Sequence, residues 1–132
     1  MFISVMTLQL HKKTMKNPTI LVTGGSGLVG QHLKDILPDA IYISSRDYNL
    51  TQPEDVIKMY ENTKPDTIIH LAARVGGIVD NIKYPVEYLE ENILMNTLVL
   101  KYAHKYNVKH LIAVLSTCIY PDKADTYPMT EE

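Results

Sequence analysis

The amino-acid sequence predicts an α/β fold, in which a doubly wound parallel sheet is covered by helices. Two observations predict it: from Thr19 onward short apolar runs alternate with amphipathic stretches, and a glycine-rich turn follows the first apolar run. Such alternation is typical of β-α-β units, because a parallel strand needs a crossover that returns the chain to the same end of the sheet. Four strands and three helices fit the chain, and right-handed crossovers favour the strand order 3-2-1-4.

The first β-α-β unit follows from its residues. The run TILVT (19–23) is too short and too rich in β-branched residues for a helix, so it predicts the first strand. Residues 28–37 then place apolar side chains at helical spacing, and Pro38 ends that helix. The run AIYIS (40–44) predicts the second strand.

Two further units complete the predicted sheet. Pro53 lies in the first turn of the second helix, where a missing N–H costs little, and Thr51 is in position to cap that helix. The third strand is predicted over DTIIHLAA (66–73), and residues 86–106 carry one apolar stripe, as expected of a long helix that covers a sheet. The run HLIAVLS (110–116) predicts the fourth strand.

Composition bounds the class of protein and its partners. The chain has 132 residues, 45% of them hydrophobic and 21% charged, with a formal net charge of −2, which is typical of one soluble domain. The balanced charge predicts no basic patch that would bind nucleic acid, and the apolar stretch 1–10 is too short to span a bilayer. One cysteine forms no internal disulfide, so we expect a cytoplasmic protein. From the charge and the short apolar stretch we expect no nucleic-acid or membrane partner. We also expect no metal, a flexible extension (1–16) and one domain (17–132).

The sequence TGGSGLVG (23–30) predicts a phosphate-binding turn. The spacing G-x-G-x-x-G is weak evidence alone, but it follows a predicted strand and opens a predicted helix, where backbone N–H groups and the positive helix end bind a pyrophosphate. Gly27 lets the backbone approach the phosphate, and Gly30 lets the helix pack closely on the sheet. The predicted cofactor-binding residues of this turn are Gly24, Gly25, Ser26, Gly27, Leu28, Val29 and Gly30. The fold is therefore predicted to be the N-terminal part of a Rossmann sheet that binds a dinucleotide.

The end of the second predicted strand bears on which dinucleotide is bound. An NAD site places an acidic residue there, on the ribose 2′-hydroxyl. The sequence has SSRD instead, and Arg46 is suited to pair with a 2′-phosphate, which favours NADP. Asp47 keeps the NAD alternative open, as the acid displaced by one or two positions, and both residues are predicted to bind the cofactor.

Four segments resemble, in order and at fitting distances, those of the GDP-L-fucose synthases of the extended short-chain dehydrogenase/reductase superfamily. They are ILVTGGSGLVG (20–30), IIHLAARVGGI (68–78), NIKYP (81–85) and LSTCIYPDK (115–123). The resemblance implies conversion of the small-molecule substrate GDP-4-keto-6-deoxy-mannose to GDP-L-fucose, by epimerisation at C3 and C5 and reduction at C4 with NADPH. It also implies a homodimer for the full-length proteins, and it assigns three residues to the cofactor site: Leu71, Ala72 and Ala73.

The last of these segments carries the candidate catalytic residues. Ser116 ends the fourth predicted strand, at the carboxyl edge where ligands bind in open α/β folds, and Cys118 follows. The resemblance implies that Ser116 polarises the C4 carbonyl and that Cys118 exchanges protons during epimerisation, which suits a thiol because its pKa lies near neutrality. The alternative for Cys118 is a small buried hydrophobic residue.

Reduction in this superfamily also needs a tyrosine four residues before a lysine, on the helix that follows this strand. The sequence has one such pair, Tyr60 and Lys64, but it lies at the amino edge of the predicted sheet, so we interpret it as a chance match. We therefore predict a Rossmann domain truncated before the Tyr-x-x-x-Lys helix. Three hypotheses stay open: the cofactor-binding part of an NADP-dependent epimerase-reductase, a non-catalytic dinucleotide-binding paralogue, and another extended-family sugar-nucleotide epimerase or dehydratase.

Three more polar residues have two interpretations. Asn92 and Asn96 stand one turn apart on the long predicted helix, and they either brace the cofactor-side loops, as the resemblance implies, or face solvent. His70, within the third predicted strand, is interpreted as a packed structural residue rather than a ligand.

Overall fold

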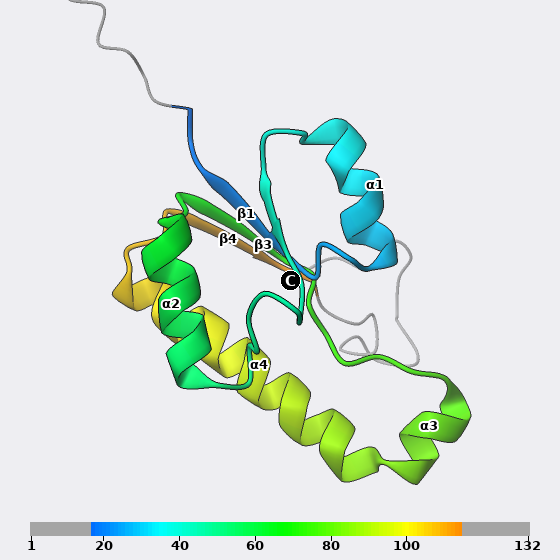
Figure 1. Cartoon of the computed structure of the whole chain (residues 1–132). Helices are drawn as coiled ribbons and strands as arrows, with labels where there is room; N and C mark the ends of the chain where they lie inside the picture. The colour runs from blue at the N-terminus through cyan, green and yellow to red at the C-terminus, as the bar shows by residue number, and fades with distance from the viewer. Residues whose placement is uncertain (1–16, 115–132) are drawn as a thin grey trace, which may run out of the picture.

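Four parallel strands form the sheet, which confirms the predicted fold class (Figure 1). The computed structural model describes residues 17–114. Its strands are β1 (Ile20–Thr23), β2 (Ile41–Ile43), β3 (Thr67–His70) and β4 (His110–Ala113). Each hydrogen-bonded pair of neighbours is parallel, so the carboxyl ends of all four strands meet at one edge of the sheet.

The strand order is β2-β1-β3-β4, and β3 therefore does not lie where the order 3-2-1-4 placed it. It pairs with β1, Val22 opposite Ile69, so the chain reverses direction across the sheet after two strands instead of three. The rule of right-handed crossovers allows both arrangements, because it fixes the face on which each helix lies and not the number of strands before the reversal. Packing between distant helices decides between them.

The structure describes four helices where the sequence predicted three. They are α1 (Leu28–Ile36), α2 (Pro53–Thr63), α3 (Ile78–Lys83) and α4 (Pro85–Lys105). The missed helix, α3, has six residues and none of them is buried, so it has no buried face to impose a periodic pattern on the sequence. Within residues 17–114, no helix is both long enough and apolar enough to cross a membrane.

The core lies between the sheet and the pair α2 and α4, with α1 on the opposite face (Figure 1). Tyr60 of α2 is fully buried, and its hydroxyl donates to the carbonyl oxygen of Val99 in α4 at 2.7 Å. Its ring also stacks on Tyr106, with ring centroids 5.2 Å apart. The crossovers β2 to β3 and β3 to β4 run the same way across the sheet, and right-handedness then requires both helices on one face. The contact between α2 and α4 thus fixes β3 beside β1.

The ends of α1 and α2 test three local predictions. Helix α1 ends at Ile36, before Pro38, as predicted. Helix α2 begins with Pro53, but Gln52 is its N-cap residue and no side chain caps it, so the prediction for Thr51 is wrong. Thr51 lies one residue before the N-cap, and its hydroxyl donates to Oδ1 of Asn49 at 2.8 Å.

Tyr60 is a structural residue, in agreement with the interpretation of Tyr60 and Lys64 as a chance pair. Burial raises the pKa of Tyr60 far above its ordinary value, so the phenol keeps its proton. Lys64 lies one residue beyond α2 with φ 44°, in the left-handed region. The pair stands at the end of α2 that precedes β3, away from the carboxyl edge of the sheet.

Candidate functional site

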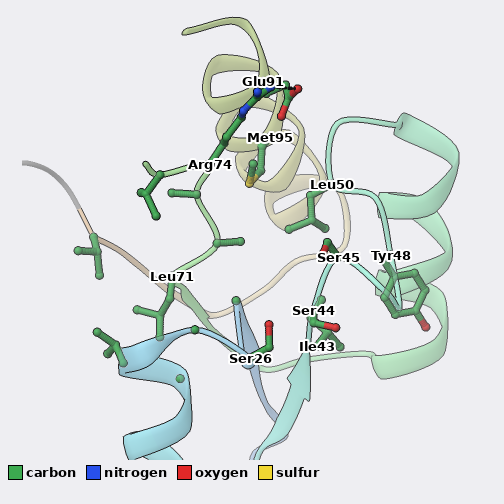
Figure 2. A pocket seen from close by; sticks show the side chains of 18 of the residues that line it. Ser26, Ile43, Ser44, Ser45, Tyr48, Leu50, Leu71, Arg74, Glu91 and Met95 are labelled. Carbon is green, nitrogen blue, oxygen red and sulfur yellow. Dashed lines mark hydrogen bonds and ion pairs between the residues drawn. The ribbon is translucent and has the colours of Figure 1, made fainter. Parts of the chain in front are cut away.

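A cleft of about 660 Å³ opens at the carboxyl edge of the sheet (Figure 2). Its walls come from the glycine turn after β1, the loop after β2, the segment after β3 and one side of α4. Nine predicted cofactor residues line it: Gly24, Ser26, Gly27, Leu28, Val29, Gly30, Leu71, Ala72 and Ala73. The structure therefore brings together two predicted segments that are more than forty residues apart in the sequence.

The glycine turn is packed too tightly for side chains at three positions, Gly24, Gly25 and Gly30, and at two of them a Cβ would strike backbone. Gly24 has φ +71°, and a Cβ there would lie 2.8 Å from the amide nitrogen of Ala72. A Cβ at Gly30 would lie 2.5 Å from the carbonyl oxygen of Gly24. These contacts hold α1 and the segment after β3 close together, which shapes the floor of the cleft.

Gly27 leaves room for a ligand at the start of α1. A Cβ at this position would meet one neighbouring atom, the carbonyl oxygen of Gly24 at 3.2 Å, and Gly27 lines the cleft. Gly27 is also the N-cap residue of α1, and no side chain caps the helix. The N-terminal N–H groups of a helix without a capping side chain are the donors that bind phosphate groups, so the turn fits a pyrophosphate.

The loop after β2 forms the second wall. Ser44 and Ser45 line the cleft, whereas the predicted residues Gly25, Arg46 and Asp47 do not. Gly25 and Asp47 line a smaller depression of about 200 Å³ beside it. Oδ2 of Asp47 accepts hydrogen bonds from the amide and the hydroxyl of Ser44, at 2.7 and 2.8 Å. These two hydrogen bonds lower the pKa of Asp47, and the bond from the amide of Ser44 has the larger effect.

A chain of hydrogen bonds supports the segment after β3 from below. The amide of Ala72 donates to Oγ1 of Thr23 at 3.2 Å, this hydroxyl lies 2.7 Å from Nδ1 of His70, and Nε2 of His70 lies 2.9 Å from Oδ1 of Asn96. Since Oδ1 only accepts, Nε2 carries the proton and Nδ1 accepts from Thr23. Burial lowers the pKa of His70, partly opposed by the bond to Asn96, so His70 is a neutral structural residue, as predicted.

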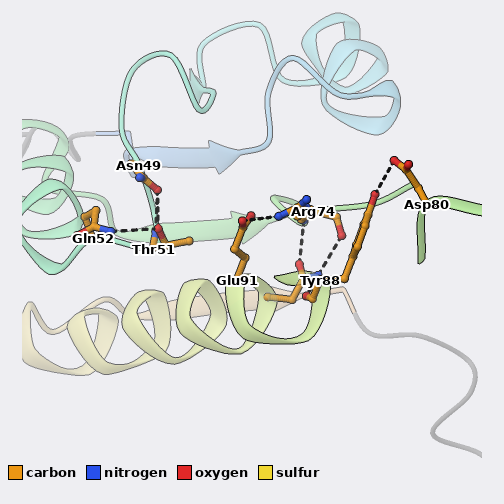
Figure 3. Close-up of polar contacts among 8 residues, drawn as sticks. Asn49, Thr51, Gln52, Arg74, Asp80, Tyr88 and Glu91 are labelled. Carbon is orange, nitrogen blue, oxygen red and sulfur yellow. Dashed lines mark hydrogen bonds and ion pairs between the residues drawn. The ribbon is translucent and has the colours of Figure 1, made fainter. Parts of the chain in front are cut away.

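Asn92 clamps the next part of the same segment. Its side chain accepts from the amide of Arg74 at 2.9 Å and donates to the carbonyl oxygen of Arg74 at 2.9 Å. The guanidinium of Arg74 pairs with Glu91 and lies 4.7 Å from the ring centroid of Tyr88 (Figure 3). Asn92 thus braces a loop of the cleft, and Asn96 supports it through His70 although its side chain is also exposed.

Sequence analysis missed several residues that line the cleft. They are Ile43, Ser44, Ser45, Tyr48, Asn49, Leu50, Thr51, Arg74, Val75, Glu91, Met95 and Val114. Most lie on loops or on α4, where apolar and polar residues occur without a motif. Arg74 belongs to the segment IIHLAARVGGI, which the resemblance singled out, but nothing in the sequence shows that Glu91 faces it. Ser116 and Cys118 lie outside the described residues.

The fold and the glycine turn define a nucleotide-binding protein, and comparison with known proteins gives its family. The chain belongs to the NAD dependent epimerase/dehydratase family, whose sequence profile matches residues 20–132. Among curated proteins it is similar to the GDP-L-fucose synthase of Dictyostelium discoideum, with 42% identity over 126 residues, 90% of this chain and 39% of the relative. The probable GDP-L-fucose synthase of Drosophila melanogaster is 37% identical over 85% of this chain and 37% of the relative.

A solved structure shows the same likeness. The GDP-L-fucose synthetase of Naegleria fowleri, crystallised with NADP, superposes with a TM-score of 0.73 at 35% identity, covering 86% of this chain and 38% of that protein. The chain thus spans about two fifths of the length of the proteins it matches.

Proposed function

We propose that this chain binds NADP in the cleft and forms the cofactor-binding part of a nucleotide-sugar epimerase-reductase of the GDP-L-fucose synthase type. The observation that carries the proposal is the glycine turn at the start of α1, where added Cβ atoms would strike backbone at Gly24 and Gly30 but at Gly27 would border the open cleft. A Rossmann-type turn of this kind accepts the pyrophosphate of a dinucleotide. The apolar side chains of Leu50 and Met95 on the far wall suit a flat base.

Two features of the loop after β2 favour NADP over NAD. Oδ2 of Asp47 already accepts two hydrogen bonds from Ser44, so this oxygen is engaged within the loop. Among residues 17–114, the guanidinium of Arg46 has no ion-pair partner within 4 Å, which leaves its charge for a phosphate. The similar protein from Naegleria fowleri was crystallised with NADP.

The chemistry of the proposed reaction belongs to the whole protein. NADPH supplies the hydride for reduction at C4 of a 4-keto nucleotide sugar. In this proposal Ser116 donates a hydrogen bond to the ketone oxygen, and Cys118 exchanges protons at C3 and C5. By the same resemblance we propose GDP-4-keto-6-deoxy-mannose as the substrate and a homodimer as the assembly, and from the single cysteine we propose the cytoplasm as the location.

Titration of the 132-residue chain with NADPH and with NADH, followed by nucleotide fluorescence, tests the cofactor assignment. We expect saturable binding with a lower Kd for NADPH. Arg46→Glu should weaken NADPH binding by roughly tenfold or more, because one charge-assisted contact to phosphate is lost and a repulsion is added. Absence of binding by either nucleotide would refute the proposal, and a preference for NADH would refute the role of Arg46.

A turnover assay tests the catalytic part separately. Oxidation of NADPH that depends on the keto sugar would support an epimerase-reductase, and Ser116→Ala should then slow it. Binding of NADPH without turnover would support the alternative of a dinucleotide-binding protein that is not a catalyst by itself.

A further inference from the structure

We propose that Asp47 is a positioning residue for the 2′-phosphate of NADP, and that its carboxylate holds the Ser44–Asp47 turn in the shape that presents Ser45 and Arg46 to that phosphate. The inference rests on the proposed function, because it assumes that NADP binds in the cleft. It assigns to Asp47 a role different from that of the ribose-binding acid of NAD sites.

The hydrogen bonds of the turn support this assignment. Oδ2 of Asp47 accepts from the amide of Ser44 at 2.7 Å and from its hydroxyl at 2.8 Å. The amide of Asp47 in turn donates to the carbonyl oxygen of Ser44 at 3.0 Å. The hydroxyl of Ser44 also accepts from the amide of Arg46 at 3.3 Å. The carboxylate therefore completes a closed set of bonds that fixes the backbone of residues 44–47.

The turn leaves two polar side chains, Ser45 and Arg46, available to a ligand. Ser45 lines the cleft, and its hydroxyl makes no hydrogen bond within residues 17–114. Arg46 is exposed next to it. Asp47 lines the smaller depression, together with Gly25 and Lys34 and apart from the main cleft. The turn thus places the neutral hydroxyl of Ser45 at the cleft and leaves the cation of Arg46 exposed next to it. The carboxylate of Asp47 is instead bonded within its own loop.

Electrostatics alone would disfavour an acid at this place. A carboxylate near a phosphate repels it, so the charge of Asp47 costs affinity for NADP. An ionised carboxylate is nevertheless a stronger acceptor than an amide oxygen, and its bonds to Ser44 hold the turn before any ligand arrives. The two effects oppose each other, and substitutions that differ in charge and in hydrogen bonding separate them.

Three variants of the full chain make the test. Asp47→Asn keeps an oxygen that accepts from Ser44 and removes the charge, whereas Asp47→Ala removes both. Asp39→Ala is the matched control, because Asp39 is exposed and precedes β2, at the opposite edge of the sheet. For each we would measure the Kd for NADPH and for NADH by nucleotide fluorescence, with circular dichroism to confirm folding.

We expect Asp47→Asn to bind NADPH at least as tightly as the parent chain, and Asp47→Ala to bind it about fivefold more weakly than Asp47→Asn, since the hydrogen bonds from Ser44, together worth about 1 kcal/mol to the shape of the turn, are lost. The Kd for NADH should change less than twofold in both variants. Ser44→Ala should weaken NADPH binding in the same direction, and the loss in the double variant Ser44→Ala with Asp47→Ala should be smaller than the sum of the two single losses, because both single variants remove the bond from the Ser44 hydroxyl to Asp47.

The opposite pattern would overturn the proposal. If Asp47 binds the ribose hydroxyl directly, both Asp47 variants lose affinity for NADH and neither loses affinity for NADPH. If the parent chain binds NADPH and Asp47→Ala binds it as tightly as Asp47→Asn does, the positioning role is wrong while the proposed function stands. If the parent chain binds neither nucleotide, the proposed function fails and this inference fails with it.

Discussion

Acid should destabilise the folded chain through His70. The neutral imidazole accepts from the hydroxyl of Thr23 through Nδ1 and donates to Asn96 through Nε2. A protonated imidazole would turn Nδ1–H toward Oγ1 of Thr23, which already accepts from Ala72. The hydroxyl proton of Thr23 would then lose its acceptor, and Thr23 is 0% exposed. The folded state therefore resists protonation at this site.

The sign and size of the effect follow from linkage. Burial lowers the pKa of His70 in the folded chain, so below about pH 6.5 the unfolded chain binds a proton that the folded chain does not. The contribution of the neutral histidine is complete above that pH and is lost as the pH falls through it. For a group that stays neutral when folded, the loss between about pH 7.5 and about pH 5.5 approaches 1.4 kcal/mol.

Urea unfolding of the full chain, followed by far-UV circular dichroism at both pH values, measures this loss. His70→Gln is the comparison, because glutamine offers an acceptor and a donor without titrating. We call the fall in the free energy of unfolding between the two pH values the acid loss. Other ionisable groups contribute to the acid loss of both proteins, so the difference between the two proteins isolates His70. Asn96→Asp should also reduce the acid loss, because a carboxylate beside Nε2 favours the imidazolium. Equal acid losses in the parent chain and in His70→Gln would refute the reasoning.

Four other substitutions test packing around the cleft and in the core. Gly30→Ala should lower the free energy of unfolding by about 1–3 kcal/mol and weaken NADPH binding, because its Cβ would lie 2.5 Å from a backbone carbonyl; unchanged affinity would contradict the packing role. Gly76→Ala should destabilise the chain because its Cβ would overlap the hydroxyl of Tyr88, and Tyr88→Phe should recover part of that loss in a double-mutant cycle of urea unfolding. Tyr60→Phe should cost about 1 kcal/mol by removing the bond to Val99, without changing the Kd for NADPH.

The parts of the fold that depend on neighbouring residues could be predicted from the sequence. The apolar runs at 19–23 and 66–73 contain β1 and β3, and Pro38 lies just beyond the end of α1. The glycine turn was predicted because each glycine has a local reason to lack a side chain, and two of those reasons, the left-handed φ of Gly24 and the close approach at Gly30, are present in the structure.

The parts that depend on distant contacts could not be predicted. The place of β3 is fixed by packing between α2 and α4, including the bond from Tyr60 to Val99 across 39 residues. Both strand orders satisfy right-handed crossovers, so no local pattern distinguishes them. Helix α3 has no buried residue, so burial imposes no periodic pattern of apolar residues on its sequence. The prediction of a Thr51 cap was wrong because α2 begins one residue later than it required, with Gln52 as the N-cap residue.

The asparagines of α4 explain how the cleft keeps its shape. Asn96 reaches the segment after β3 through His70, and Asn92 binds the backbone of Arg74 directly. The wall from Leu71 to Ala73 is therefore held at both ends by one face of one helix. The opposite wall, the turn of residues 44–47, is closed by its own hydrogen bonds. Since the two walls share no hydrogen bond within residues 17–114, changes in the turn should alter the preference between NADPH and NADH, whereas changes in α4 should alter affinity for both.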